Sequence, residues 1–236
     1  MAQHSLSPPA LVFRWLVGIG LVSWRYLWST TPLHRTESHE PLPQLPPPFP
    51  PGFPTERVQS WEAGVGSMFH RLFRVRVAGA HKGTMALMGT VTADLGRLVP
   101  TEVVRVHKGD ASDRPLRQGD EIVVDMPGPW NGPVRVVAAE PGRLQLATLA
   151  GHLEAGQIEF RAYDADPHLV FEVETWARPA TLMVHLLHSH LRLAKEIQLN
   201  MWVRFCLAAA RAAGGKPAGG VEIRTTVTPA LLRQDS

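Results

Sequence analysis

The chain has 236 residues, of which 44% are hydrophobic and 19% charged, so it can bury a sizeable core and is not globally disordered. Its 24 Lys and Arg residues leave a net charge of only +3, and they form no basic tract. A nucleic-acid partner is therefore excluded from the prediction.

The most apolar stretch is residues 10–28, ALVFRWLVGIGLVSWRYLW. Its length is close to the roughly 20 residues that cross a bilayer, and its tryptophans are typical of a membrane interface, but Arg14 interrupts it. Three interpretations stay open: a helix that spans or lies on the membrane, a helix docked on the domain, and a signal sequence, which here lacks a cleavage site. We predict a cytoplasmic protein that this segment could attach to the inner face of the cell membrane.

Proline dominates the segment that follows, PLPQLPPPFPPGFP at residues 41–54. Such a composition favours an extended, semi-rigid chain, either a linker or a strap across a domain surface. The segment divides the chain into predicted units: an N-terminal apolar helix and tail (1–40), the linker or strap (41–60), a folded domain (61–215), and a C-terminal tail with a possible extra strand (216–236).

Within the folded domain, alternation predicts a strand at 70–78, and apolar spacing predicts a helix at 81–99 that ends before Pro100. Further strands are predicted at 101–107, 120–126, 134–139, 144–149, 155–163 and 169–177. Turn signals stand at Asn131-Gly132 and at residues 140–143.

The last long element is a helix that Pro179 opens and Gly214-Gly215 ends. Its apolar residues recur mostly three or four apart. A sheet with one apolar face needs another layer that covers that face, and this helix is the long element available to do so. The predicted fold class is therefore α+β of the helix-grip type, a curved antiparallel sheet of about seven strands packed on a long C-terminal helix.

Several long runs resemble a known family: LATLAGHLEAGQIEFRAY (146–163), FEVETWARPA (171–180), GDEIVVDMPGPWNGPVRVV (119–137) and AKEIQLNMW (194–202). They are similar to the nineteen-ninety family of domains of unknown function, which is grouped with SRPBCC-like (START and Bet v 1-like) folds. MFHRLFRVRV (68–77) and WRYLWSTTPLHR (24–35) resemble its bacterial, mainly actinobacterial, branch. Pro179-Ala180 departs from that branch, which usually has small residues and no proline at these positions.

The resemblance implies the helix-grip fold and adds no catalytic residues, because the family has none established. Relatives of this fold usually bind apolar ligands, and a minority act on them as enzymes. We therefore expect a small apolar, lipid-like ligand in a cavity between the sheet and the C-terminal helix.

Six residues are candidates for the ligand site: Trp130, His152, Glu154, Glu159, Trp176 and Arg178. His152 and Glu154 stand in a loop between two glycines, where they could reach a cavity mouth or simply cap a turn. Glu159 could point inward with a raised pKa, or join a ladder of cross-strand ion pairs on the solvent side. The two tryptophans could line the mouth or cover the core.

An enzyme of unknown reaction is the main alternative, with His152, Glu154 and Glu159 supplying acid and base chemistry. That alternative requires the three side chains to converge. No metal is predicted, because His190 cannot share a helix face with His185 and His188, and no HExxH or cysteine cluster exists. We interpret Cys206, the single cysteine, as a small apolar residue of a helix. No cofactor is predicted, and the sequence sets no oligomeric state.

The membrane interpretation of residues 10–28 makes a direct prediction. The full chain should sediment with membranes, whereas a chain that begins at Thr31 should stay in the supernatant, because it lacks the apolar segment. Fractionation of both forms, followed by blotting, measures the difference. Equal partitioning of the two forms would rule out the tether.

Overall fold

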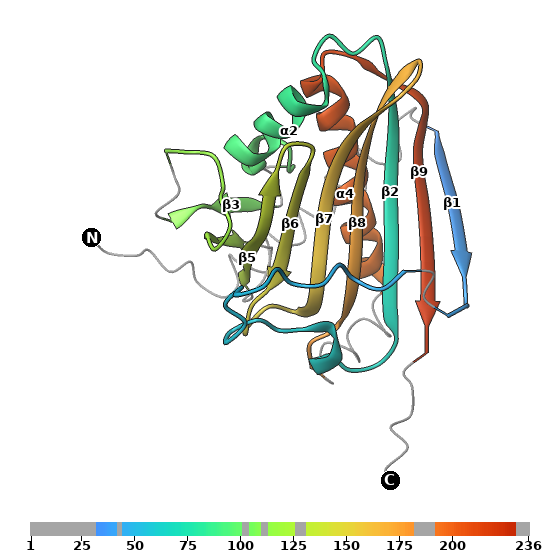
Figure 1. Cartoon of the computed structure of the whole chain (residues 1–236). Coiled ribbons are helices and arrows are strands. Elements are labelled where there is room, and N and C mark those ends of the chain that lie inside the picture. Colours follow the sequence, from blue (N-terminus) through green and yellow to red (C-terminus); the bar gives the residue numbers. More distant parts are fainter. Residues whose placement is uncertain are drawn as a thin grey trace, which may run out of the picture.

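One curved sheet of nine strands organises the part of the chain that the structure describes (Figure 1). The structure is a computed structural model that describes residues 32–41, 44–100, 104–109, 113–125, 131–181 and 192–229. The strands are β1 (Leu33–Ser38), β2 (Met68–Ala78), β3 (Arg105–His107), β4 (Glu121–Asp125), β5 (Asn131–Glu140), β6 (Arg143–Thr148), β7 (Glu154–Ala165), β8 (His168–Pro179) and β9 (Lys216–Thr228). Their order is β1-β9-β2-β8-β7-β6-β5-β4-β3, and every pair is antiparallel except β1 with β9.

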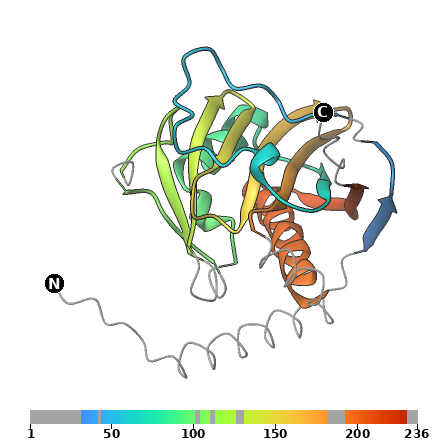
Figure 2. The ribbon, with the colours of Figure 1, turned by 90° about the horizontal axis from the view of Figure 1, so that it is seen from below.

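Both α-helices of the described residues, α2 (Thr84–Ala93) and α4 (Arg192–Ala212), pack on the same face of the sheet. Seen from below, the sheet curls around α4, which lies inside the curve (Figure 2). Two short 3-10 helices complete the set, η1 (Trp61–Ala63) before β2 and η2 (Leu95–Arg97) after α2. We call the face that carries the helices the inner face and the opposite one the outer face.

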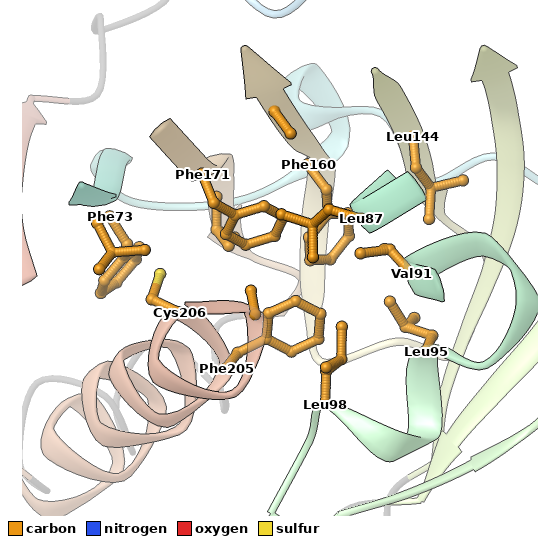
Figure 3. Close-up of a cluster of buried hydrophobic side chains, with 14 of the residues drawn as sticks. Phe73, Leu87, Val91, Leu95, Leu98, Leu144, Phe160, Phe171, Phe205 and Cys206 are labelled. Atoms are coloured by element: carbon orange, nitrogen blue, oxygen red, sulfur yellow. The ribbon is translucent and has the colours of Figure 1, made fainter. Parts of the chain in front are cut away.

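Apolar side chains of the inner face and of the helices form one packed cluster (Figure 3). The Phe205 ring of α4 lies 5.1 Å from Phe160 of β7 and 5.9 Å from Phe171 of β8, measured between ring centroids. Phe73 of β2 and Leu87 of α2 are fully buried in the same cluster. Because side chains alternate between faces along a strand, these contacts assign every other residue of β2, β7 and β8 to the inner face.

The Pro-rich segment crosses the outer face (Figures 1 and 2). Phe53, which is 7% exposed, packs on Val137 and Ala147 of the sheet. The indole of Trp176 donates a hydrogen bond to the Gln44 carbonyl at 3.0 Å. Arg135 donates to the Pro54 carbonyl at 2.6 Å. These contacts tie the described part of the segment, from residue 44 onward, to the sheet.

The α+β helix-grip class is confirmed, but the sheet differs in detail from the expected one. It contains nine strands because β1 and β9 extend it beyond β2. The C-terminal strand β9 is therefore an internal strand that pairs on both edges. The sequence pattern predicted only a tail with a possible extra strand. The parallel β1–β9 pair makes the sheet mixed.

Three local predictions were wrong. Asn131-Gly132 is not a turn, because both residues pair with Asp125 and Val124 as the start of β5. Pro179 does not open a helix, because it ends β8 opposite Glu154. The helix expected at 81–99 is shorter, since α2 ends at Ala93 and a 3-10 turn follows.

Residues 10–28 lie outside the described residues, so their membrane interpretation stays a prediction. Among the residues that the structure does describe, no helix is both long enough and apolar enough to cross a membrane.

The packed cluster predicts the effect of truncating Phe205. Phe205→Ala removes a fully buried ring and should lower the free energy of unfolding by about 3–5 kcal/mol. Met85→Ala is the matched control, because Met85 lies on α2 but is 71% exposed, and it should change that free energy by less than about 0.5 kcal/mol. Urea unfolding measures both, and equal losses would contradict the packing of α4.

Candidate functional site

A polar relay crosses the interface between α4 and the inner face, at the end where β2 and α4 begin. Arg71 of β2 donates from Nη1 to the Gln198 amide oxygen at 2.6 Å. The Gln198 amide nitrogen donates to both carboxylate oxygens of Glu154 at 3.0 Å. The relay therefore joins β2, α4 and β7 beside the apolar cluster of the inner face.

Arg71 is the most unusual member of the relay. Its side chain is 2% exposed, and Nε and Nη2 have no hydrogen-bond partner among the described residues. Burial lowers the pKa of its guanidinium, although the charges of Glu154 and Glu37 act against that shift. An arginine keeps its proton in a protein, so the interface holds a buried cation with two donors that no described residue satisfies.

Apolar side chains surround this polar end. The guanidinium carbon of Arg71 lies 4.9 Å from the centroid of the Phe69 ring. Ile158 of β7 and Trp202 of α4 are both half-buried and border the core cluster. The indole Nε1 of Trp202 is a third buried donor without a partner among the described residues. We call Arg71, Gln198, Glu154 and Trp202 the inner-face site.

His152 lies beside this site but serves the local turn. Its Nδ1 accepts a hydrogen bond from the Glu154 backbone N–H at 2.9 Å, and burial lowers its pKa. Gln59 donates its amide to the backbone carbonyls of His152 and Glu154, at 3.0 and 2.9 Å. In this geometry, His152 caps the turn and is not placed as a proton donor at a cavity mouth.

Glu159 lies on the opposite face of the sheet from Glu154. Its carboxylate pairs with Arg143 at 2.8 Å and with Arg161 at 3.2 Å, while its neighbour Phe160 faces α4. His152, Glu154 and Glu159 therefore do not converge, and the acid/base arrangement that required their convergence is wrong. The reason is that side chains alternate between the two faces along β7, so residues 154 and 159 lie on opposite faces.

Trp176 and Arg178 also face outward, on β8. The Trp176 ring stacks on His70 with centroids 5.3 Å apart. Arg178 donates from Nε and Nη2 to the Gly66 carbonyl, at 3.0 and 2.7 Å, and so holds the loop before β2. Trp130 lies outside the described residues. The five predicted ligand residues that the structure describes are thus not gathered around one interior space, and of these five only Glu154 belongs to the inner-face site.

Buried carboxylates form a continuous ion-pair network on the outer face. Arg161 donates from Nη2 to Glu172 at 2.9 Å and to Glu174 at 2.6 Å. His70 contacts Glu174 at 2.7 Å, and Arg74 pairs with Glu172. Each of these carboxylates has at least two partners, which is what burial of charge requires. The network is a structural ladder of the sheet.

An open groove of about 630 Å³ lies along β1, β9 and β2. Its polar lining includes Arg74, Arg76, His34 and Glu222. None of the five predicted ligand residues that the structure describes lines it. No group of three His, Cys, Asp or Glu residues within the described ranges could hold a metal ion, and the three histidines at 185, 188 and 190 lie outside those ranges.

Arg71 was missed by the sequence prediction, although a signal for it exists. In the run FHRLFRVRV, Arg71 shares its parity with Phe69, Phe73 and Val75, whereas Arg74 and Arg76 have the opposite parity. A charged residue on the apolar side of an amphipathic strand is exceptional, because burial of a charge is costly. Gln198 has no such signal, since a glutamine is common on any helix face.

The chain matches one family model and resembles several solved structures. The model of a family described as Domain of unknown function (DUF1990) matches residues 55–209. A search of curated proteins finds no match. Solved structures with a similar arrangement include the KanY protein, with 8% identity over 64% of this chain and 99% of that one and a TM-score of 0.45. Another is Ara h 8.0201, with 9% identity over 62% and 99% and a TM-score of 0.42. A third is the hypothetical protein jhp0584 from Helicobacter pylori, with 10% identity over 60% and 87% and a TM-score of 0.45.

The outer network predicts a pH dependence. Burial acts to raise the pKa of Glu172, but hydrogen bonds from Arg74 and Tyr163 and the charges of Arg74 and Arg161 hold it below its ordinary value. A carboxylate whose pKa falls on folding stabilises the protein above the unfolded value, about 4.3, and loses that contribution as the pH falls through the folded value.

Glu172→Gln should therefore destabilise the protein by on the order of 2–3 kcal/mol near neutral pH, less than for a fully buried pair because its arginine partners are partly exposed. The difference from wild type should shrink as the pH falls toward about 3. Unfolding curves over this pH range test it, with the exposed Glu56→Gln as control. A difference that stays constant with pH would contradict the assignment.

Proposed function

The chain belongs to the DUF1990 family of domains of unknown function, and from that premise we propose that it binds a small apolar ligand at the inner-face site. The observation that carries the proposal is the set of three buried donors, Nε and Nη2 of Arg71 and Nε1 of Trp202, that have no acceptor among the described residues. Buried polar groups in proteins are nearly always hydrogen-bonded. A ligand that offers acceptor oxygens would complete them.

The apolar body of the ligand follows from the walls of the site. Deeper along α4, the rings of Phe73, Phe160 and Phe171 are fully buried in the packed cluster. At the inner-face site, by contrast, Phe69 and Ile158 keep part of their surface uncovered. Burial of that surface against a ligand would be favourable by about 25 cal/mol per Å². The ligand would thus cover apolar surface and satisfy polar donors together, as in most small-molecule sites.

The test is native mass spectrometry of the full chain purified from its own host. We expect a population with an added small mass that is lost on denaturation. Ile158→Trp adds bulk on the inner face at the level of Arg71, because Ile158 and Arg71 both pair with Thr175 of β8, and it should reduce that population severalfold. Leu45→Trp is the control, since Leu45 is 61% exposed on the Pro-rich segment, and it should leave the population unchanged.

A wild-type chain that carries no added mass, and that binds no apolar fluorescent probe when titrated, would contradict the proposal. Equal loss in both variants would also count against it, because the bound mass would then depend on general stability rather than on the inner-face site.

A further inference from the structure

We propose that the ligand carries a carboxylate, which Arg71 binds through two parallel hydrogen bonds from Nε and Nη2. This inference rests on the proposed function, because it names the head group of the same ligand. Nε–H and the adjacent Nη2–H lie side by side on one edge of the planar guanidinium. That edge matches the two oxygens of a carboxylate, which explains why arginine is the residue that recognises such groups in pairs.

Two other arginines of this chain show how the same edge is used. Arg135 donates from Nε and Nη2 to Glu121, at 3.2 and 2.6 Å. Arg178 donates from the same two atoms to the Gly66 carbonyl. Arg71 is at least as deeply buried as either, yet its Nε and Nη2 have no acceptor within the described ranges. The Nε and Nη2 edge, which contacts oxygen atoms in Arg135 and Arg178, is therefore the edge that Arg71 offers to a ligand.

The charge balance favours an anion with a single charge. Among the described residues, Arg71 donates to the neutral Gln198 amide, and its Nε and Nη2 contact no carboxylate. Glu154 and Glu37 act on it from farther away. One carboxylate would neutralise the buried cation by contact, whereas a phosphate dianion would add a second negative charge near Glu154 and Glu37.

The relay holds the guanidinium ready for such a ligand. The Gln198 amide is oriented by its two donations to Glu154, so its oxygen is fixed toward Nη1 of Arg71. The guanidinium carbon lies over the Phe69 ring. A positioned donor edge loses little freedom on binding, which improves affinity. Trp202 lies one turn farther along α4 than Gln198, where its Nε1 can serve another part of the ligand.

Calorimetric titration of the full chain with three probes of one chain length, dodecanoate, dodecanol and dodecyl phosphate, tests the head group. We expect dodecanoate to bind roughly tenfold or more tightly than dodecanol, which lacks the charge and one oxygen. Dodecyl phosphate should bind more weakly than dodecanoate. Arg71→Lys, which keeps the charge but lacks the paired edge, should lose roughly tenfold or more in affinity for dodecanoate.

Arg76→Lys is the matched control, since Arg76 is on the same strand but is exposed on the outer face, and it should bind as wild type does. Arg71→Gln should abolish the preference for dodecanoate over dodecanol. A residue with only a structural role would change stability without changing that preference. Thermal unfolding of each variant separates the two effects, and if Arg71→Gln does not fold, Arg71→Lys and the wild-type preference decide.

The outcomes separate the two claims. If no probe binds the wild-type chain, the proposed function itself is wrong. If dodecanol binds as tightly as dodecanoate, or if Arg71→Lys keeps full affinity, the ligand site stands and the carboxylate assignment is wrong. Tighter binding of dodecyl phosphate would overturn the assignment in favour of a phosphate group.

Discussion

Phe205 of α4 packs against Phe160 and Phe171 on two adjacent strands, and this contact decides which side of the sheet becomes the interior. A sheet with one apolar face is stable only when another layer covers that face. Once α4 occupies it, the alternation of side chains along each strand fixes the environment of every other residue. The packed cluster, the inner-face site and the outer ion-pair network all follow from that single assignment.

The same assignment explains why Arg71 is exceptional. It occupies an inner-face position in β2, in the row that Phe73 and Val75 fill with apolar groups. An aliphatic residue at this position would carry no desolvation cost of a charge, whereas a buried cation is expensive unless it is hydrogen-bonded and neutralised. Gln198 and Glu154 meet part of that requirement. A site that keeps such a residue is a better candidate for binding than the apolar cluster above it, where the aromatic rings already contact one another.

The outer face follows a different rule. Its carboxylates are as deeply buried as Arg71, but each is held by arginine or histidine partners on neighbouring strands. Perturbed groups in such a network stabilise the sheet and need not mark chemistry. Glu159 shows the difference: from its pattern alone it could equally join a ladder or face a cavity, and the ladder on the outer face is what the structure contains.

Much of the fold was predictable from the sequence alone. The period-two patterns located β2 and β4 to β8, and the helical spacing located α2 and the later part of α4, because burial on one face imposes those periods locally. Errors arose where local chemistry misled: Asn131-Gly132 resembles a turn and Pro179 a helix start, yet strand pairing overrode both. Strand β9 was only weakly indicated, because its place between β1 and β2 depends on residues almost two hundred positions away.

The candidate site was predictable only in part. The sequence singled out Glu154 but gave it the wrong companions, His152 and Glu159, since proximity along the chain does not show which face a side chain occupies. By itself the sequence determined the fold class, the family and the parity that makes Arg71 unusual. Only the tertiary structure brought Arg71, Gln198 and Glu154 together, because they belong to three elements whose mutual positions are set by long-range packing.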